Sequence, residues 1–310
     1  MLAKLIRQFL EYIEVERNRS LKTIENYQFY LNRFLEWADA HGLKNAGDIT
    51  IDTIHEYRLW LNRLHGDKPL KKNTQNYHII AMRSFLKYLS KRDIKALAPE
   101  KIELAKIPQR TVAFLDTDDL DLLLSAPERE REALIIKKRD RAILELLFST
   151  GLRVSELASL KRSHINLKRD EFSIRGKGDK YRIVFLSARA QEHVKAYLDA
   201  RKDAFEPLFI RHDRAFDPRM KHNESELHLT PRSIQRLIKK YSKIAGITKK
   251  ISPHTIRHSY ATDLLMNGAD IRSVQSLLGH ASITTTQIYT HITNQHLRDV
   301  HKAFHGKTRK

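Results

Sequence analysis

Apolar side chains recur at every third or fourth position through most of the first hundred residues. The runs that show this spacing span residues 2–13, 20–41, 51–61 and 73–89. Such spacing places the apolar side chains on one face of a helix. Ser20 is a suitable N-cap for the second run, and Gly42 is a suitable end for it. The pattern predicts four amphipathic helices that form a bundle over residues 1–97.

The helical pattern breaks after this bundle. The segment "KALAPEKIELAKIPQR" contains Pro99 and Pro108 and has no sustained apolar face of its own. Proline interrupts regular structure, and segments of this kind commonly join domains. We therefore expect a linker over residues 98–112 and a second domain over residues 113–310.

The second domain has mostly helical spacing, with one interruption. Residues 115–124 and 139–160 have helical patterns, and the chain from about Thr230 onward is helical again. Between them, "FSIRGKGDKYRIVFL" has two short β-type runs around a Gly-Lys-Gly-Asp turn. The sequence predicts a mainly α fold with one small β-hairpin.

Composition narrows the class of protein. A length of 310 residues favours two domains, and no apolar run approaches the ~18 residues needed to cross a bilayer. The N-terminus carries acidic residues where a signal peptide stays apolar, so we expect a cytoplasmic, nucleoid-associated protein with no membrane partner. The absence of cysteine excludes disulfides, thiolate chemistry and Cys-ligated zinc.

Net charge points to the kind of partner. The chain carries 57 Lys and Arg against 37 Asp and Glu, which gives a formal charge of +20. Such an excess neutralises phosphates and makes affinity depend on salt. A polyanion is the expected partner, with a generally basic enzyme as the alternative.

One pair of basic residues lies beside a helix-start signal in "KISPHTIRHSYATDLLMNGAD". Ser252 suits an N-cap and Pro253 the first helical position. His254 and Arg257 are three residues apart, so they lie on one face near the helix N-terminus, where backbone amides favour an anion. We expect a phosphate clamp, and an ordinary surface His and Arg remain the alternative.

A second basic residue follows a glycine in "STGLRVSELASL". Arg153 is expected at the head of a helix capped by Ser149 or Thr150, with Glu156 one turn further on. A guanidinium grips two phosphate oxygens at once, and a carboxylate beside it would fix its orientation. The alternative is a simple surface ion pair.

The remaining candidates lie in turns and near the C-terminus. Lys177 occupies the tip of the glycine-flanked hairpin, where it is either a proton donor or a solvated side chain. Gly279 suits the end of a helix, His280 follows it, and Ser282 would cap the helix that carries Tyr289. A tyrosine hydroxyl has a pKa near 10, so it acts as a nucleophile only with a base and cations nearby. Otherwise Tyr289 belongs to the apolar face of its helix.

Taken in order, these motifs resemble the active-site set of the tyrosine recombinases, the lambda-integrase family. The matching stretches are "GLRVSEL", "RGKGDKYRIV", "HTIRH", "LLGH" and "TTTQIYTH". The N-terminal stretch "RSLKTIENYQFYLNRFLEW" is similar to the core-binding domain of the Xer recombinases. The resemblance covers nearly the whole chain and implies a four-helix, SAM-like core-binding domain followed by a catalytic domain.

The chain departs from the Xer pattern in four places. Phe185 stands where proline is common, residues 128–138 and 211–229 are longer than expected, and the chain ends in "FHGKTRK". None of these departures removes a residue of the matched set. The resemblance therefore does not extend to the details of subunit exchange and partner recognition.

The resemblance implies DNA cleavage and rejoining without a metal or nucleotide cofactor. Tyr289 would attack a phosphodiester, release a 5′-hydroxyl and hold the 3′ end as a phosphotyrosine. His254 would accept the tyrosine proton, and Lys177 would protonate the leaving oxygen.

The other matched residues would bind the reacting phosphate or support the residues that bind it. Arg153, Arg257 and His280 would stabilise negative charge on its non-bridging oxygens. Glu156 would support Arg153. No acidic cluster suggests a metal site, so no cofactor is expected.

The resemblance also implies partners. These are a double-stranded DNA recombination site, and a homotetramer on two sites or a heterotetramer with a second recombinase. A DNA translocase is a further candidate. Residues 293–304 would dock into a neighbouring subunit or pack within their own. The expected role is Xer-type resolution of chromosome or plasmid dimers. The alternatives are an integrase or resolvase of a mobile element, a type IB topoisomerase-like enzyme, and a non-catalytic DNA-binding protein.

Overall fold

The computed structural model describes residues 1–64, 66, 69–107, 113–176, 181–212 and 227–279. By its internal contacts the chain divides into two compact units, residues 1–110 and residues 111–310. The two units are considered separately.

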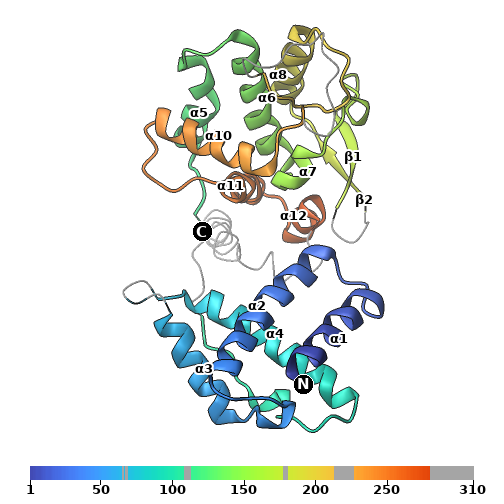
Figure 1. Ribbon diagram of the computed structural model, residues 1–310. Coiled ribbons are helices and arrows are strands. Elements are labelled where there is room, and N and C mark those ends of the chain that lie inside the picture. The colour runs from blue at the N-terminus through green and yellow to red at the C-terminus, as the bar shows by residue number, and fades with distance from the viewer. Residues whose placement is uncertain (65, 67–68, 108–112, 177–180, 213–226, 280–310) are drawn as a thin grey trace, which may run out of the picture. The chain divides into compact units, whose positions relative to one another are not determined.

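Four α-helices form the N-terminal unit in its described part. They are α1 (Leu2–Val15), α2 (Leu21–Ala40), α3 (Ile51–Arg63) and α4 (Lys72–Lys91) (Figure 1). Ser20 is the N-cap residue of α2, and Gly42 follows its end with a positive φ of 72°. The four-helix prediction is confirmed.

Aromatic rings fill much of the core of this unit. Phe9, Phe34, Tyr57 and Phe85 are each 1% exposed or less. The rings of Phe34 and Tyr57 meet edge to face with centroids 5.1 Å apart, and Phe9 meets Phe85 in the same way at 5.7 Å. Edge-to-face contacts add specific geometry to apolar burial, so these rings fix how the helices pack.

The chain after α4 stays in contact with this unit. Ile102 is 1% exposed and belongs to the same apolar core. The Asn76 side chain donates a hydrogen bond to the Ala105 carbonyl at 2.9 Å and accepts one from its amide at 3.1 Å. The first half of the segment expected to be a linker is therefore bound to the N-terminal helices.

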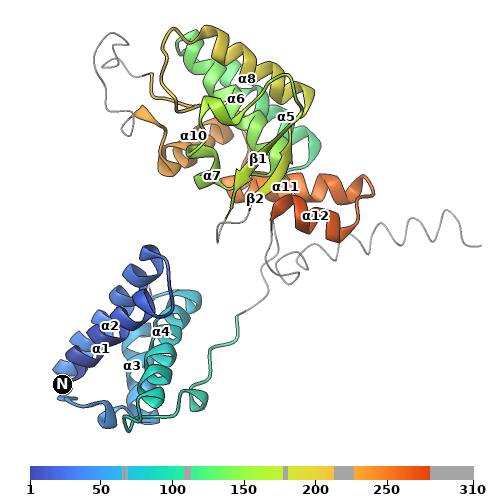
Figure 2. The ribbon, with the colours of Figure 1, turned by 90° about the vertical axis from the view of Figure 1, so that its right-hand side faces the viewer.

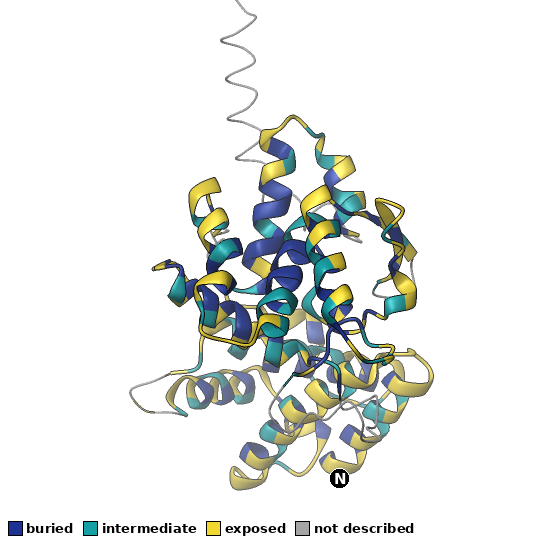
Figure 3. Ribbon diagram, turned by 90° about the horizontal axis from the view of Figure 1, so that it is seen from above, coloured by how far each residue is buried: buried dark blue, intermediate teal, exposed yellow. Residues whose placement is uncertain are grey.

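The described part of the C-terminal unit is helical apart from one hairpin. The helices are α5 (Thr117–Ser125), α6 (Leu134–Thr150), α7 (Val154–Ala158), α8 (Ala188–Ala200), α10 (Pro231–Ile244), α11 (Pro253–Met266) and α12 (Ile271–Leu278). Helix α6 is central, since every residue from Asp140 to Leu147 is buried. It packs against α5, α8 and α11. Figure 3 marks the buried residues of the described chain in dark blue.

The predicted hairpin is present. Strands β1 (Glu171–Arg175) and β2 (Tyr181–Phe185) pair antiparallel, with Glu171 opposite Phe185 and Arg175 opposite Tyr181. Strand β2 contacts α12, and the two lie close together in Figure 2. This contact brings a strand from the middle of the chain to the end of a helix almost a hundred residues later.

The expected cap of α7 is wrong. Helix α6 continues through Ser149 and Thr150, and Gly151 ends it with a φ of 58°. The Thr150 hydroxyl donates to the carbonyl of Leu146 within α6, and Arg153 itself occupies the N-cap position of α7. Thr150 is therefore part of the end of α6, because its hydroxyl bonds back along that helix.

Within the described residues, none of the helices combines the length and the apolar character that crossing a bilayer requires.

Replacing Gly151 should destabilise the C-terminal unit more than replacing another left-handed glycine. A Cβ at residue 151 would lie 2.5 Å from Tyr260 Cδ1, whereas one at Gly246, with a φ of +74°, would meet nothing within 4 Å. We expect Gly246→Ala to cost roughly 1 to 2 kcal/mol for the left-handed backbone, and Gly151→Ala roughly 1 to 3 kcal/mol more for overpacking.

Urea denaturation followed by far-UV circular dichroism measures this difference. Both tryptophans, Trp37 and Trp60, lie in the N-terminal unit, so their fluorescence transition serves as the internal control and should not move. Equal destabilisation by the two substitutions would contradict the packing argument.

Candidate functional site

Arg153 and Glu156 form the expected pair at the start of α7. The Arg153 guanidinium donates from Nη1 to Glu156 Oε1 at 2.7 Å. Its backbone amide donates to Glu156 Oε2 at 2.8 Å, as in the second half of a capping box. The Arg153 side chain is 30% exposed, against 7% for that of Glu156. A largely buried carboxylate therefore holds an arginine that still reaches solvent.

A second arginine, which the sequence analysis did not single out, binds the same carboxylate. Arg182 on β2 donates from Nη1 to Glu156 Oε1 at 3.0 Å and from Nη2 to Oε2 at 2.7 Å. The sequence contains a signal for it. Strand alternation places Arg182 on the same face of β2 as the buried Val184, and a charged side chain on an inward face requires a partner.

The ionisation of Glu156 follows from these contacts. Burial alone would raise its pKa, but hydrogen bonds from Arg182 and Arg153 and the charge of Arg182 outweigh it and lower the pKa to about 2. Glu156 is therefore a carboxylate at any pH near neutrality, and it attracts both guanidinium groups.

Arg257 is buried, which rules out the surface alternative for this residue. It is 5% exposed and donates from Nη1 to the Gly151 carbonyl and from Nη2 to the Leu278 carbonyl, both at 2.5 Å. It lies on α11, which begins as expected with Ser252 accepting a hydrogen bond from the Thr255 amide. Arg257 thus joins the end of α6 to the end of α12.

The two histidines of "HTIRH" differ in environment. His254, in the first turn of α11, is exposed. Burial, with the nearby charges of His254 and Arg257, lowers the pKa of His258 to about 4. His258 is therefore neutral near pH 7. His254 and Arg257 lie three residues apart on α11, one exposed and one buried, and the clamp expected of them stays a prediction.

The three arginines converge on the last turn of α12, where three successive carbonyls accept from them. Arg182 Nε donates to Leu277 at 3.2 Å, Arg257 Nη2 to Leu278 at 2.5 Å, and Arg153 Nη2 to Gly279 at 3.2 Å. The C-terminal end of a helix carries partial negative charge, so cations stabilise it. As expected, Gly279 ends α12, with a φ of 62°.

The other candidates lie outside the described residues. These are Lys177, between β1 and β2 in the sequence, His280, directly after Gly279, and Tyr289. Residues 293–304 also lie outside them. Within the described ranges, no group of three His, Cys, Asp or Glu side chains is placed to hold a metal ion.

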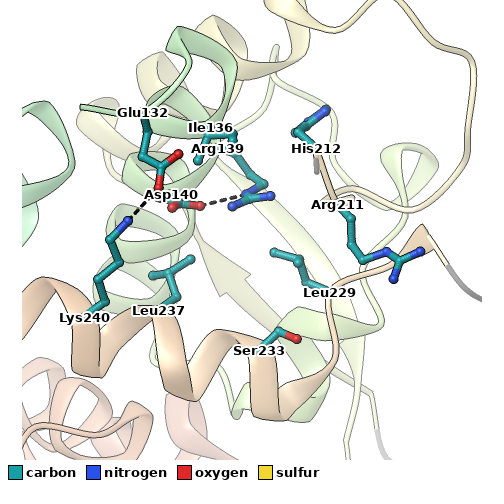
Figure 4. A pocket seen from close by; sticks show the side chains of 10 residues that line it. All are labelled: Glu132, Ile136, Arg139, Asp140, Arg211, His212, Leu229, Ser233, Leu237 and Lys240. Carbon is teal, nitrogen blue, oxygen red and sulfur yellow. Dashed lines mark hydrogen bonds and ion pairs between the residues drawn. The ribbon is translucent and has the colours of Figure 1, made fainter. Parts of the chain in front are cut away.

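A cavity of about 290 Å³ in the same unit is a separate feature (Figure 4). Its described lining includes Arg139, Asp140 and Lys240 but not Arg153, Glu156, His254 or Arg257. Asp140 accepts hydrogen bonds from Arg139 at 2.7 Å and from the Tyr241 hydroxyl at 2.8 Å. These charges satisfy one another, so the cavity wall is explained by packing.

Comparison with known proteins identifies this arrangement. Residues 113–296 match the phage integrase family, and residues 6–93 match the phage integrase N-terminal SAM-like domain. The chain belongs to the phage integrase family. The matched regions together include both helical units and the arginine cluster.

Proteins that match this chain over nearly its whole length are named tyrosine recombinases. A protein of Thermodesulfovibrio yellowstonii named tyrosine recombinase XerC is 35% identical over 97% of this chain and 95% of its own length. One of Listeria monocytogenes named tyrosine recombinase XerD is 38% identical over 98% of this chain and 99% of its own. The family shown by these matches is that of the tyrosine recombinases.

Solved structures that resemble this chain include site-specific recombinases. The XerH site-specific recombinase bound to palindromic difH substrate, in a post-cleavage complex, is 25% identical with a TM-score of 0.70. The match covers 95% of this chain and 83% of that one. The fold assigned to the sequence, mainly α with a small hairpin, is confirmed.

The stability contributed by Glu156 should disappear in acid. Its folded pKa of about 2 lies below the ordinary value of 4.5, so its stabilisation is complete above pH 4.5 and is lost as pH falls towards 2. Glu156→Gln should cost about 1 to 3 kcal/mol at neutral pH, because Arg182 loses its charged partner. The difference from wild type should shrink over that acid range.

Unfolding of both proteins in urea at a series of pH values measures this. Glu11→Gln removes an exposed carboxylate that lies 3.9 Å from Arg7 and should change little at any pH. A difference between Glu156→Gln and wild type that stays constant down to the lowest pH would contradict the assigned ionisation.

Proposed function

We propose that this chain is a site-specific tyrosine recombinase of Xer type, which cuts and rejoins DNA through a 3′-phosphotyrosine intermediate. The observation that carries the proposal is the arginine cluster, in which Arg153 and Arg257 come from different helices and meet at one turn. Phosphoryl transfer is catalysed chiefly by positioning and by fixed positive charge. Two guanidinium groups held in place by hydrogen bonds within the protein meet that need.

The roles of the individual residues follow from their chemistry. Tyr289 attacks the phosphorus, which breaks the bond to the 5′ oxygen and leaves the 3′ end on the tyrosine. His254 accepts the tyrosine proton, and Lys177 delivers a proton to the departing 5′ oxygen. The exposure of His254 supports a role at a surface open to DNA.

The remaining groups stabilise charge on the phosphate. Arg153, Arg257 and His280 face the non-bridging oxygens, and Glu156 holds Arg153 in place. The partial exposure of Arg153, at 30%, supports direct contact with a substrate. The reaction conserves the energy of the phosphodiester bond, so no nucleotide cofactor is needed.

Double-stranded DNA is the substrate. The net charge of +20 supports an extended anionic partner, and the XerH relative is described as bound to its difH substrate. Residues 1–97 bind the core site, residues 113–310 carry out catalysis, and residues 98–112 connect them. The working assembly is a homotetramer on two sites, or a heterotetramer with a second recombinase, in the cytoplasm at the nucleoid.

The biological role that fits the relatives is resolution of chromosome or plasmid dimers. The names XerC and XerD recur among proteins that match nearly the whole of this chain. A DNA translocase is a further partner in this proposal. A plasmid that carries two copies of the site tests the role, since the enzyme should convert it into two circles.

Tyr289 should be essential for the covalent step alone. On a duplex that carries its own recombination site, nicked near the cleavage point, the wild-type protein should form an adduct that survives denaturing electrophoresis. Tyr289→Phe should form none, because it lacks the attacking oxygen, and should still bind the duplex. An adduct with Tyr289→Phe, or none with wild type, would contradict the assignment.

Arg153 should matter far more for cleavage than for binding. Arg153→Ala should slow adduct formation on the nicked duplex roughly 100- to 1000-fold, the loss typical of one preorganised charge-stabilising donor. Affinity for the duplex should change only a few-fold, because many phosphate contacts share it. Lys195→Ala, which breaks an exposed pair with Asp199 at 2.7 Å, is the control and should cleave normally.

A further inference from the structure

We infer that Arg182 is a positioning residue for strand cleavage, which holds the Arg153 guanidinium through the carboxylate they share and sets it against the last turn of α12. The inference rests on the proposed function, because it assigns Arg153 to the reacting phosphate. Arg182 was not among the residues that the sequence motifs indicated, and three features of its surroundings support the assignment.

The first feature is that Arg182 is fully engaged within the protein. Its Nη1 and Nη2 bind the two oxygens of Glu156, and its Nε binds the Leu277 carbonyl. Its side chain is 9% exposed, against 30% for Arg153. Of the two arginines that bind this carboxylate, Arg153 is therefore partly exposed to solvent and Arg182 is nearly buried.

The second feature is the balance of charge. Glu156 alone would neutralise Arg153 and weaken its attraction for a phosphate. Arg182 shares the carboxylate, so the group of three keeps a net positive charge while Arg153 stays oriented by Oε1 at 2.7 Å. Without Arg182, Glu156 would still orient Arg153, but it would also cancel the positive charge with which Arg153 attracts a phosphate.

The third feature is the fit between Arg182 and the end of α12. A Cβ on Gly279 would lie 2.9 Å from Arg182 Cδ and 3.3 Å from Nε. Residue 279 therefore needs to be glycine for two reasons: it adopts a φ of +62°, and a side chain there would collide with Arg182. Arg182 thus links three elements: strand β2, the start of α7 and the last turn of α12.

A buried ion pair by itself is weak evidence of function, because such pairs also occur for structural reasons alone. The same unit offers a comparison. Arg201 has a side chain with 0% exposure, pairs with Asp203, and donates to the Pro207 and Leu208 carbonyls at 2.8 and 2.9 Å. Among the described candidates, its hydrogen bonds reach neither Arg153, Glu156, His254 nor Arg257. Arg182→Gln and Arg201→Gln therefore remove similar interactions, one inside the site and one outside it.

The test measures single-turnover adduct formation on the nicked duplex, together with affinity for that duplex. Each rate is normalised to the folded fraction found by thermal denaturation. Arg182→Gln should slow cleavage roughly 10- to 100-fold, the loss typical when a partner that orients a catalytic group is removed. Affinity should change by less than about 3-fold, because the Arg182 side chain is 9% exposed and all three guanidinium nitrogens bind groups of the protein. Arg201→Gln, so normalised, should cleave at the wild-type rate.

Two further variants separate positioning from simple destabilisation. Arg182→Lys keeps the positive charge but loses the two-pronged geometry, so its rate should lie between wild type and Arg182→Gln. In a Glu156→Gln background, Arg182→Gln should add little, because the path from Arg182 to Arg153 is already broken. If Arg182→Gln does not fold, Arg182→Lys carries the same comparison.

The outcomes are distinct. Failure of the wild-type protein to form any adduct overturns the proposed function, and this inference with it. Normal adduct formation by wild type, with Arg182 variants equal to wild type or no slower than Arg201→Gln, overturns the inference and leaves the proposed function standing. Slow cleavage with full additivity to Glu156→Gln also overturns it, since Arg182 would then act by another route.

Discussion

The carboxylate of Glu156 is the interaction on which the site depends. It is largely buried and ionised, and it accepts hydrogen bonds from two arginines and one backbone amide. Desolvating a carboxylate is costly unless its partners are well placed, so the positions of β2 and the start of α7 are constrained together. The same two arginines, Arg153 and Arg182, also bind the last turn of α12, so the position of that turn depends on Glu156 as well.

Most of the fold could be predicted from the sequence because it rests on local patterns. The four N-terminal helices follow the spacing of apolar residues, and the hairpin follows two β-type runs around a glycine turn. Ser149 and Thr150 show the limit of such reasoning. A hydroxyl before glycine suits either the start or the end of a helix, and packing of α6 through Thr150 decides between them.

Local sequence patterns predicted only part of the candidate site. The Arg153–Glu156 pair lies within one turn, so spacing alone indicated it. The burial of Arg257 and the part played by Arg182 depend on contacts between segments about 20 to 130 residues apart, which no local pattern records. Motif order supplied the candidate residues, whereas the tertiary structure determines how the arginines among them are held.

If Arg153 binds the substrate phosphate as proposed, its hydrogen bond to Gly279 couples substrate binding to the position of the last turn of α12. The same Nη2 that donates to the Gly279 carbonyl at 3.2 Å belongs to the most exposed of the three guanidinium groups. An anion that takes this donor competes with the carbonyl for it. Binding at the phosphate and seating of the last turn of α12 are then thermodynamically linked, and the linkage acts equally in both directions.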